Sequence, residues 1–392
     1  MQKGSYKFDR MEFAGSLGDL GTLIPLSVAM IVINGLNATA VFLMVGLFYI
    51  GAGLYYKLPI PVQPLKVVAA IAIASKMDAA TIAASGYLMG VILLFIAATG
   101  IVDVLARLFT KPIVRGIQLG LGFILISKGI AFIGKDELLI NGAKGSAVVW
   151  NVSQNTLVGM LGVLLVIFLL TNKRLPAAIA VILFGLAVSA LSGAIGGVSF
   201  SIGFEPVSLF LPERAVLLNA LVLLVIPQIP LTVGNAVMGT ADTARSLFGE
   251  EKAKRSTFKS FATSMGLANI GAGAVMGMPM CHGAGGLAAH YRFGARTGGS
   301  NLMIGTIFVV IAVVFGKMAI SLLGLIPNSI LGVLLLFAGL ELAMLIRDVT
   351  EKKDFFVAFF IAGIALATTN MGIAFVAGMI VLYVINLAKI EI

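Results

Sequence analysis

Apolar residues occupy most of the chain in long runs, which charged residues or Gly, Asn and Pro breaks separate. Runs of about 20 apolar residues are long enough to cross a bilayer as helices, and about fourteen segments can be distinguished. Their approximate centres are residues 23, 47, 68, 90, 123, 160, 187, 226, 267, 286, 310, 336, 362 and 380. The pattern predicts an all-α polytopic membrane protein with about fourteen membrane segments.

The third and tenth segments, at about 61–75 and 277–291, are too short to cross as regular helices. They contain the breaks Pro61-Val-Gln-Pro-Leu-Lys66 and Met278-Pro-Met-Cys-His-Gly-Ala-Gly-Gly286, which lie 218 positions apart (279 − 61). Proline biases the residue before it away from helix. We therefore expect an extended leading strand followed by a half-helix in both segments, with Pro64 in the first helical turn of one and Cys281-His282 opening the other.

A polar connector, residues 205–214, divides the segments into two sets of seven. Because seven is odd, the second set begins on the opposite side of the membrane, and the two halves, 12–200 and 213–389, are inverted. Gly18-Asp19 in span 1 corresponds to Gly234-Asn235 in span 8 at an offset of 216 (235 − 19), close to that of the proline breaks. The sequence thus predicts a seven-plus-seven inverted repeat with half-helices as spans 3 and 10.

Composition and charge agree with a membrane protein. Hydrophobic residues make up 59% of the chain and charged residues only 11%, against about 25% charged in soluble domains. The net charge of +10 does not indicate a nucleic-acid partner, because most of the 27 Lys and Arg residues fall in loops on the inner side when both termini are cytoplasmic. The single cysteine excludes an intrachain disulfide.

The predicted start of half-helix 3 favours an anion. Its free amides and helix dipole attract negative charge, Gln63 lies at its mouth, and Lys66 adds a full positive charge within one turn. The alternative is structural: Lys66 snorkels or pairs with an embedded carboxylate such as Asp19.

Half-helix 10 repeats this arrangement with Cys281, His282 and Gly283. Glycines here allow a ligand or a backbone to approach closely, or serve tight helix packing. His282 can donate a hydrogen bond or titrate, and a satisfied interior histidine is the alternative. Cys281 is a weak donor or inert apolar filler.

Three further polar residues lie in or beside apolar spans. Asp19 is a candidate for binding a coupling proton or cation, or for balancing the charge of Lys66. Asn235 is its neutral counterpart in span 8, after an expected break at Pro227-Gln-Ile-Pro230, and we expect it to contact substrate. Asp242 lies two turns later, near the inner boundary, where a gate or helix-end role competes with substrate contact. Asp242 and His282 are, like Asp19, candidates for proton coupling.

Other chemistry has no support in the sequence. No His, Cys, Asp or Glu cluster has metal-ligand spacing, and no Ser/His/Asp arrangement, HExxH, Walker or dinucleotide motif occurs. The sequence therefore predicts no metal, no cofactor, no ATP hydrolysis and no enzymatic activity.

Three segments resemble the molybdate transporter family, a relative of the sulfate permeases. They are Gly18-Asp-Leu-Gly-Thr-Leu-Ile-Pro25, Pro61-Val-Gln-Pro-Leu-Lys66 and Pro279-Met-Cys-His-Gly-Ala-Gly-Gly-Leu-Ala-Ala-His-Tyr-Arg-Phe-Gly-Ala-Arg-Thr-Gly298. Thr240-Ala-Asp-Thr-Ala-Arg245 also resembles the family pattern. The resemblance implies a substrate-carrying core (12–110 and 215–320) and a gate (112–200 and 326–389), with substrate between the starts of half-helices 3 and 10.

The resulting hypothesis is a secondary active transporter of the cell membrane that imports molybdate by alternating access. Sulfate and tungstate have the same charge and shape as molybdate, so a sulfate or general oxyanion permease stays open, as does an anion channel. A proton, sodium or no coupling ion at all is compatible with the sequence. Dimers in the wider superfamily make a homodimer an expectation by analogy.

Overall fold

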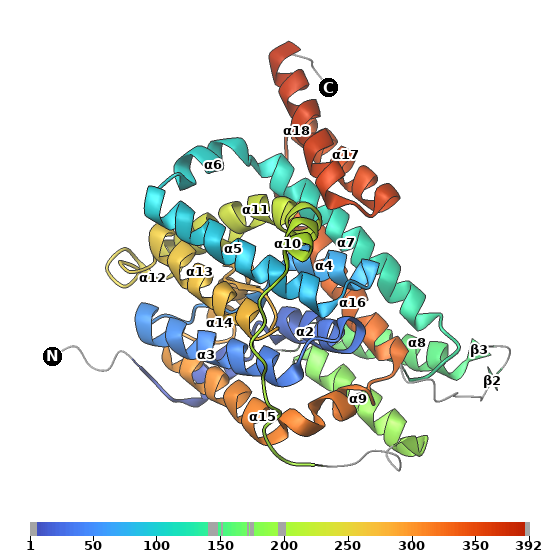
Figure 1. Ribbon diagram of the computed structural model, residues 1–392. Coiled ribbons are helices and arrows are strands. Elements are labelled where there is room, and N and C mark those ends of the chain that lie inside the picture. Colours follow the sequence, from blue (N-terminus) through green and yellow to red (C-terminus); the bar gives the residue numbers. More distant parts are fainter. Residues whose placement is uncertain are drawn as a thin grey trace.

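The computed structural model describes residues 6–139, 148–149, 152–170, 172, 176–194 and 201–388 (Figure 1). The expected ends of the two repeats, residues 200 and 389, lie outside the described residues. The helices of the first half are α1 (Arg10–Ser16), α2 (Leu20–Asn34), α3 (Ala38–Tyr56), α4 (Lys66–Ser75), α5 (Ala79–Thr99), α6 (Val102–Leu108), α7 (Lys111–Ile133), α8 (Gln154–Leu169) and α9 (Ala177–Leu191). Those of the second half are α10 (Arg214–Ala220), η2 (Leu221–Val225), α11 (Ile226–Leu231), η3 (Thr232–Gly239), α12 (Thr240–Phe248), α13 (Phe258–Ala274), α14 (Ala284–Arg292), α15 (Gly299–Leu323), α16 (Asn328–Ala343), η4 (Met344–Asp348), α17 (Lys352–Thr368) and α18 (Met371–Ala388).

The protein is a helical, polytopic membrane protein. Among the described residues, 7 helices are long and apolar enough to cross a membrane, and an eighth span results if α1 and α2, bent by 44°, count together. Every predicted segment centre falls inside one of the helices. How many of the shorter helices complete a crossing stays a prediction.

The first span is not one regular helix. It breaks at Leu17–Asp19, between α1 and α2, where a Cβ on Gly18 would lie 2.9 Å from the Ala289 carbonyl of α14. Glycine therefore allows this bend to touch α14 directly. The break places Asp19, which immediately precedes α2, beside the short helix.

The helix does not end at Pro227 or Pro230, so the expected break there is wrong. Residues Arg214–Phe248 make one continuous helix of 35 residues, and the turns on either side of α11 widen into the π-helical stretches η2 and η3. Proline removes a backbone donor and crowds the preceding turn. Here the helix accommodates this by widening rather than by ending.

Glycines form the contacts between three long helix pairs. In the pair α3–α15, a Cβ on Gly46 would lie 2.7 Å from the Gly305 carbonyl. In α5–α13, a Cβ on Gly90 would lie 2.8 Å from the Gly266 carbonyl; in α7–α16, one on Gly122 would lie 2.7 Å from the Gly339 carbonyl. Small residues bring these backbones into contact where apolar lipid gives no hydrophobic drive for helix association.

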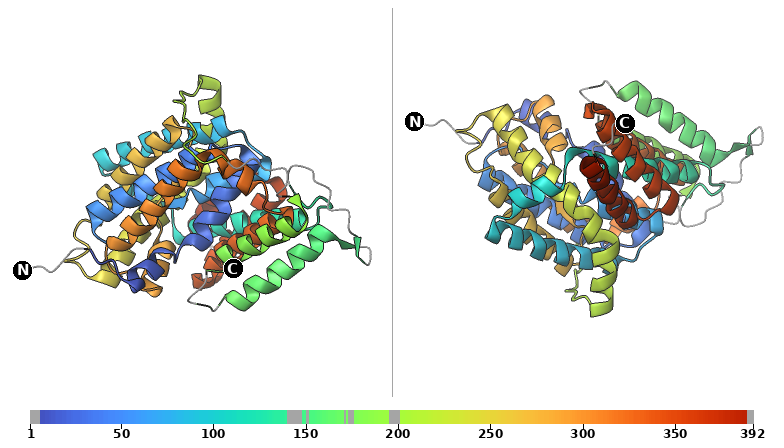
Figure 2. Two further views of the ribbon diagram at one scale, coloured as in Figure 1. Left: turned by 90° about the horizontal axis from the view of Figure 1, so that it is seen from below. Right: turned by 90° about the horizontal axis from the view of Figure 1, so that it is seen from above.

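The helices pack in two groups. One contains α1 to α5 with α10 to α15, including the pairs α3–α15 and α5–α13, and the other contains α7 to α9 with α16 to α18. In both views of Figure 2 the green and red helices of the second group lie on the side away from the N-terminus. The groups meet mainly where α2 contacts α9 and α16, and where α4 contacts α7.

The two proline-glycine breaks meet as a pair of strands. β1 (Gln63–Pro64) runs antiparallel to β4 (Met280–Cys281), and Gln63 lies opposite Cys281, 218 positions away (281 − 63). A separate short hairpin joins β2 (Val148–Val149) to β3 (Val152–Ser153). Each short helix follows its strand: α4 begins after the N-cap Leu65, and α14 begins after the N-cap Gly283. The predicted helix starts at Pro64 and at Cys281-His282 are therefore wrong by a few residues, because the backbone at Pro64 and Cys281 is paired as strands.

Candidate functional site

The extended segment before α4 has no helix to satisfy its backbone, yet it is buried. In a membrane such groups need protein partners. Four side chains from other parts of the chain donate to four successive carbonyls of this segment. They are His290 Nδ1 to Pro59 (3.1 Å), Asn301 Nδ2 to Ile60 (2.7 Å), His282 Nδ1 to Pro61 (2.8 Å) and the Tyr49 hydroxyl to Val62 (3.2 Å).

His282 belongs to this support and does not face an open site. Its Nδ1 must carry the proton, because the Pro61 carbonyl only accepts. Its Nε2 lies 3.0 Å from the Ser264 hydroxyl, and its ring packs against Phe48, Tyr56 and Phe261. Both nitrogens contact protein, which is the arrangement of a satisfied interior histidine; the expected contact with substrate stays a prediction.

Cys281 likewise faces protein. Its thiol is buried and contacts the Pro64 carbonyl at 3.5 Å. Met280 lies on the same strand as Cys281, and Asn269 of α13 binds both of its backbone groups. The Asn269 side chain accepts from the Met280 N–H at 2.8 Å and donates to its carbonyl at 2.7 Å. Side chains thus hold the second break in position, as they do the first.

The N-terminus of α4 is largely occupied. The Gln228 Oε1 accepts from the amides of Val67 (2.9 Å) and Val68 (3.3 Å), the second and third residues of the helix. Within the described part of the chain, the predicted group of free amides is therefore reduced to that of Lys66. Sequence reasoning missed Gln228, although a polar residue between Pro227 and Pro230 in an apolar run was a signal.

The N-terminus of α14 is open. Among the described residues none accepts a hydrogen bond from the amides of Ala284, Gly285 or Gly286, whereas Leu287 begins the helical pattern by donating to Gly283. Gly285 is exposed, and a Cβ placed on it would meet no atom within 4 Å. Unpartnered amides and the positive end of the helix dipole, with open space beside Gly285, suit an anion.

Asp19 and Gln63 lie against the start of α14. The Gln63 Nε2 donates to both oxygens of Asp19, at 2.8 and 2.7 Å. A Cβ on Gly286 would lie 2.5 Å from Asp19 Oδ2 and 2.7 Å from Gln63 Nε2, so a side chain at this position would have to displace Asp19 and Gln63. The buried Gln63 Oε1 has no hydrogen-bond partner in the described part of the chain. An acceptor without a partner and a set of free amides therefore lie next to each other.

Lys66 provides the positive charge of this region. Its side chain is buried at 9% exposure and interacts electrostatically with Asp19 and Glu341. The described residues contain no direct ion pair involving Lys66. Its interaction with Asp19 therefore acts at longer range than an ion pair, and the oxygens of Asp19 accept hydrogen bonds from Gln63.

Glu341 of α16 was missed by the sequence analysis. It is exposed and interacts electrostatically with Lys66 of the opposite helix group. Glu341 lies where the two helix groups meet, since a Cβ on Gly21 of α2 would lie 3.9 Å from Glu341 Oε1, and Thr22 neighbours both Glu341 and Asp19. An acid inside the apolar run Leu340-Glu-Leu342 is the signal that identified Asp19, and it applies equally here.

The two remaining predicted residues, Asn235 and Asp242, lie in different surroundings. Asn235 lies on η3, which packs against α14; it is half-buried, and its side chain makes no hydrogen bond within the described ranges. Asp242 is 64% exposed and pairs with Arg245 at 3.7 Å, so it lies outside the buried cluster of Asp19, Gln63 and Lys66. No group of three His, Cys, Asp or Glu side chains in the described residues is placed to hold a metal ion.

Comparisons with solved structures define the class. The transmembrane domain of a cyanobacterial bicarbonate transporter, BicA, aligns with a TM-score of 0.65 at 17% identity, covering 95% of this chain and 99% of that one. Murine Slc26a9, an anion transporter solved in the inward-facing state, aligns at 0.66 and 15% identity, covering 99% of this chain and 70% of that one. The fold is that of a polytopic membrane transporter.

Sequence comparisons give the family. The family model described as "Molybdate transporter of MFS superfamily" matches residues 11–125 and 220–342. Molybdate transporter 1 of Arabidopsis thaliana is 30% identical, covering 95% of this chain and 87% of that protein, and molybdate transporter 2 of the same plant is 29% identical over 97% and 88%. Molybdate transporter 1 of Chlamydomonas reinhardtii is 26% identical over 94% and 90%. The chain belongs to the molybdate transporter family and is a transporter, not an enzyme.

Proposed function

We propose that this protein imports molybdate across the cell membrane and binds it in front of the α14 N-terminus, beside Lys66. The observation that carries the proposal is the combination of unpartnered amides at Ala284 to Gly286 with the open space at Gly285. Membership of the molybdate transporter family supplies the substrate class.

A tetrahedral dianion suits this position for physical reasons. Its oxygens accept hydrogen bonds from the free amides, and the helix dipole and the buried Lys66 ammonium offset its charge. Asn235 of the adjacent η3 adds an uncommitted amide side chain. Gln63 acts on the site by holding Asp19, and His282, Cys281 and Gly283 act by fixing the backbone around it.

The contact pattern supports the proposed inverted repeat. If span n of the first half corresponds to span n + 7, the pair of spans 2 and 11 (α3–α15) is equivalent to the pair 9 and 4 (α13–α5). Both pairs pack through glycines. The pairs α7–α16 and β1–β4 would then each map onto themselves. A two-fold axis in the membrane plane has these consequences.

The two packing groups support alternating access between a core and a gate. The first group corresponds to the proposed core, 12–110 and 215–320, and the second to the gate, 112–200 and 326–389. The anion site belongs to the core, and Glu341 of the gate lies where α16 packs against α2. Movement of one group against the other would open the site to either side in turn, with both termini on the cytoplasmic side and two copies forming a homodimer.

Charge balance favours proton coupling through Glu341. The charged groups that interact with it are Lys66 and Asp19. Lys66 offsets only one of the two charges of a bound dianion, so the remaining negative charge faces the Glu341 carboxylate. Two like unit charges about 6 Å apart repel by roughly 3 kcal/mol at an effective dielectric constant of about 20. Protonation of Glu341 removes this repulsion, so a proton would enter with the substrate.

Uptake of labelled molybdate into proteoliposomes tests the proposal. We expect saturable uptake that an inward proton gradient stimulates and that a large excess of sulfate leaves mostly intact. Uptake that sulfate abolishes would make the protein a general oxyanion permease, and flux without saturation would indicate a channel. Stimulation by a sodium gradient instead of a proton gradient would contradict the coupling. Absence of uptake under all gradients would overturn molybdate transport.

A further inference from the structure

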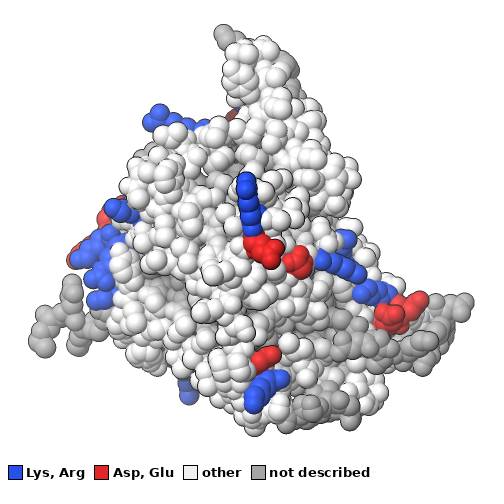
Figure 3. All heavy atoms as spheres, in the orientation of Figure 1, with Lys and Arg blue, Asp and Glu red and all other residues white. Residues whose placement is uncertain are grey.

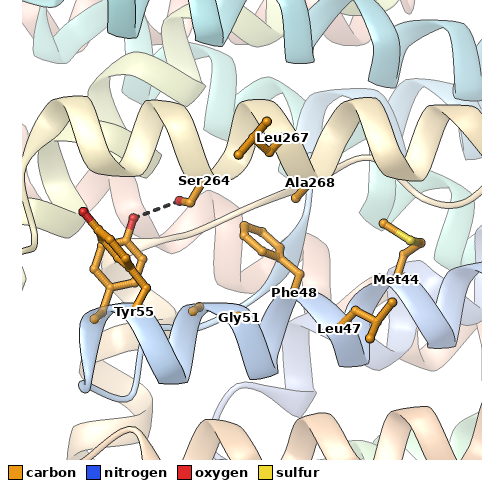
Figure 4. A pocket seen from close by; sticks show the side chains of 10 residues that line it. Met44, Leu47, Phe48, Gly51, Tyr55, Ser264, Leu267 and Ala268 are labelled. Carbon is orange, nitrogen blue, oxygen red and sulfur yellow. Dashed lines mark hydrogen bonds between the residues drawn. The ribbon is translucent and has the colours of Figure 1, made fainter.

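A groove between α3 and α13 is separate from the anion site. Its volume is about 310 Å³, and it is lined by Met44, Leu47, Phe48, Gly51, Ala52, Tyr55, Tyr56, Ser264, Leu267 and Ala268. Figure 4 shows Met44, Leu47, Phe48 and Tyr55 on one helix facing Ser264, Leu267 and Ala268 on the other. The groove is apolar over most of its length, and its outer rim is accessible, with Leu267 at 60% exposure.

One end of the groove is basic. Arg255, just before α13, donates to the Tyr55 carbonyl at 2.8 Å, and its guanidinium lies 5.7 Å from the Tyr55 ring. Two exposed lysines lie near these residues in the sequence. Lys57 follows α3, two positions after Tyr55, and Lys254 directly precedes Arg255. Figure 3 shows Lys and Arg side chains gathered at the left edge, where Figure 1 places the connection between α12 and α13. Tyrosine and basic residues at helix ends are typical of the membrane interface.

We propose that this groove binds an anionic phospholipid, with part of an acyl chain between α3 and α13 and the headgroup phosphate on Arg255. The apolar length matches a hydrocarbon chain, which the surrounding bilayer supplies. The basic end matches a phosphate, and Arg binds phosphate oxygens through two parallel N–H donors. A zwitterionic lipid fits the apolar part but gains less from the charges of Arg255, Lys57 and Lys254.

The floor of the groove connects the lipid to the transport site. Phe48 and Tyr56 line the groove and pack on the His282 ring, with centroids 4.7 and 5.7 Å away. The Tyr56 hydroxyl lies 2.8 Å from Ser264, which lies 3.0 Å from His282, and His282 donates to Pro61 in the segment before α4. A bound acyl chain would therefore limit the motion of side chains that hold this segment.

Lipid titration of the purified full-length protein tests the site. Binding of phosphatidylglycerol and of phosphatidylcholine would be measured by native mass spectrometry, alongside the thermal unfolding midpoint without lipid. We expect the wild type to prefer phosphatidylglycerol. Arg255→Gln should weaken phosphatidylglycerol binding about fivefold, the contribution of one basic residue at an anionic surface.

A second variant tests the apolar part. A Cβ on Gly51 would meet no atom within 4 Å, so Gly51→Val fills the groove without a clash and should also weaken phosphatidylglycerol binding. Gly363→Val, at another exposed glycine with free space, and Arg214→Gln are the matched controls and should bind as wild type. Wild-type binding by both Arg255→Gln and Gly51→Val, or equal binding of the two lipids, would overturn the proposal. Because lipid binding is measured without transport, its failure is distinct from failure of the proposed function.

Discussion

His282 illustrates what single residues do in this protein. A sequence with a histidine beside a glycine-rich break favours a ligand contact, and nothing local indicates that its Nδ1 reaches a carbonyl 221 positions away. The same holds for Asn301 and Tyr49, whose partners also lie in the segment before α4. The polar residues of the site could be predicted because polar groups in apolar spans are rare. Which of these residues hydrogen-bond to the protein backbone could not be predicted from the sequence.

Replacing His282 by alanine should lower stability more than it lowers affinity. The change leaves the buried Pro61 carbonyl without its partner and removes one of the contacts of the Ser264 hydroxyl, which costs about 1–3 kcal/mol. Thermal unfolding in detergent should show a lower midpoint, while the folded fraction binds molybdate with near wild-type affinity. A normal midpoint combined with lost binding would instead make His282 a substrate ligand.

Replacing Lys66 by glutamine should lower molybdate affinity more than it lowers stability. The variant removes a buried positive charge from the proposed site, and hydrogen bonds to charged groups contribute about 1.5–3 kcal/mol, so molybdate affinity should fall about tenfold or more. Isothermal titration calorimetry would measure this, with Lys317→Gln on the exposed surface as the control. Unchanged affinity with a reduced yield of folded protein would favour a purely structural lysine.

At the scale of elements, proline and glycine residues within apolar runs predicted the two short helices and the strands that precede them. The same residues predicted helix starts a few positions too early, and a break at Pro227 and Pro230 where the helix continues. Strand pairing between Gln63 and Cys281, and the cap that Gln228 forms on α4, depend on segments distant in sequence. Such pairings decide where a helix begins, and a local pattern does not contain them.

The glycine contacts make a prediction for helix packing. Gly122→Leu places a side chain where the Gly339 carbonyl lies only 2.7 Å from the Cβ position. The helices α7 and α16 must then separate, which should destabilise the protein by about 1–3 kcal/mol or more. Thermal unfolding would measure the loss against Gly363→Val, which has free space. Equal midpoints would show that the two helices do not need this close contact.

At the scale of the whole molecule, the sequence predicted the class of fold but not which groups face each other across it. Glu341 lies in the second half of the chain, on the helix group opposite Lys66, and the packing of α2 against both α4 and α16 brings them together. The expected coupling residue Asp242 instead lies on the surface, paired with Arg245. Contacts between the groups are a property of the whole fold.

Proton coupling is tested at this scale. Because a neutral side chain replaces a titrating one, Glu341→Gln should retain molybdate binding and lose the stimulation of uptake by an inward proton gradient. Proteoliposome uptake at several external pH values would measure it, with Asp242→Asn as the control that keeps the stimulation. Stimulation that persists in Glu341→Gln would assign the proton to another group.

The most direct test of the account is the molybdate affinity of Gly285→Val, compared with wild type and Gly363→Val by isothermal titration calorimetry. Both positions have free space, so neither change should alter the thermal midpoint appreciably. We expect wild type and Gly363→Val to bind molybdate, and Gly285→Val to lose binding because its side chain occupies the open space beside the first turn of α14. Wild-type affinity in Gly285→Val would contradict the placement of the anion at this helix.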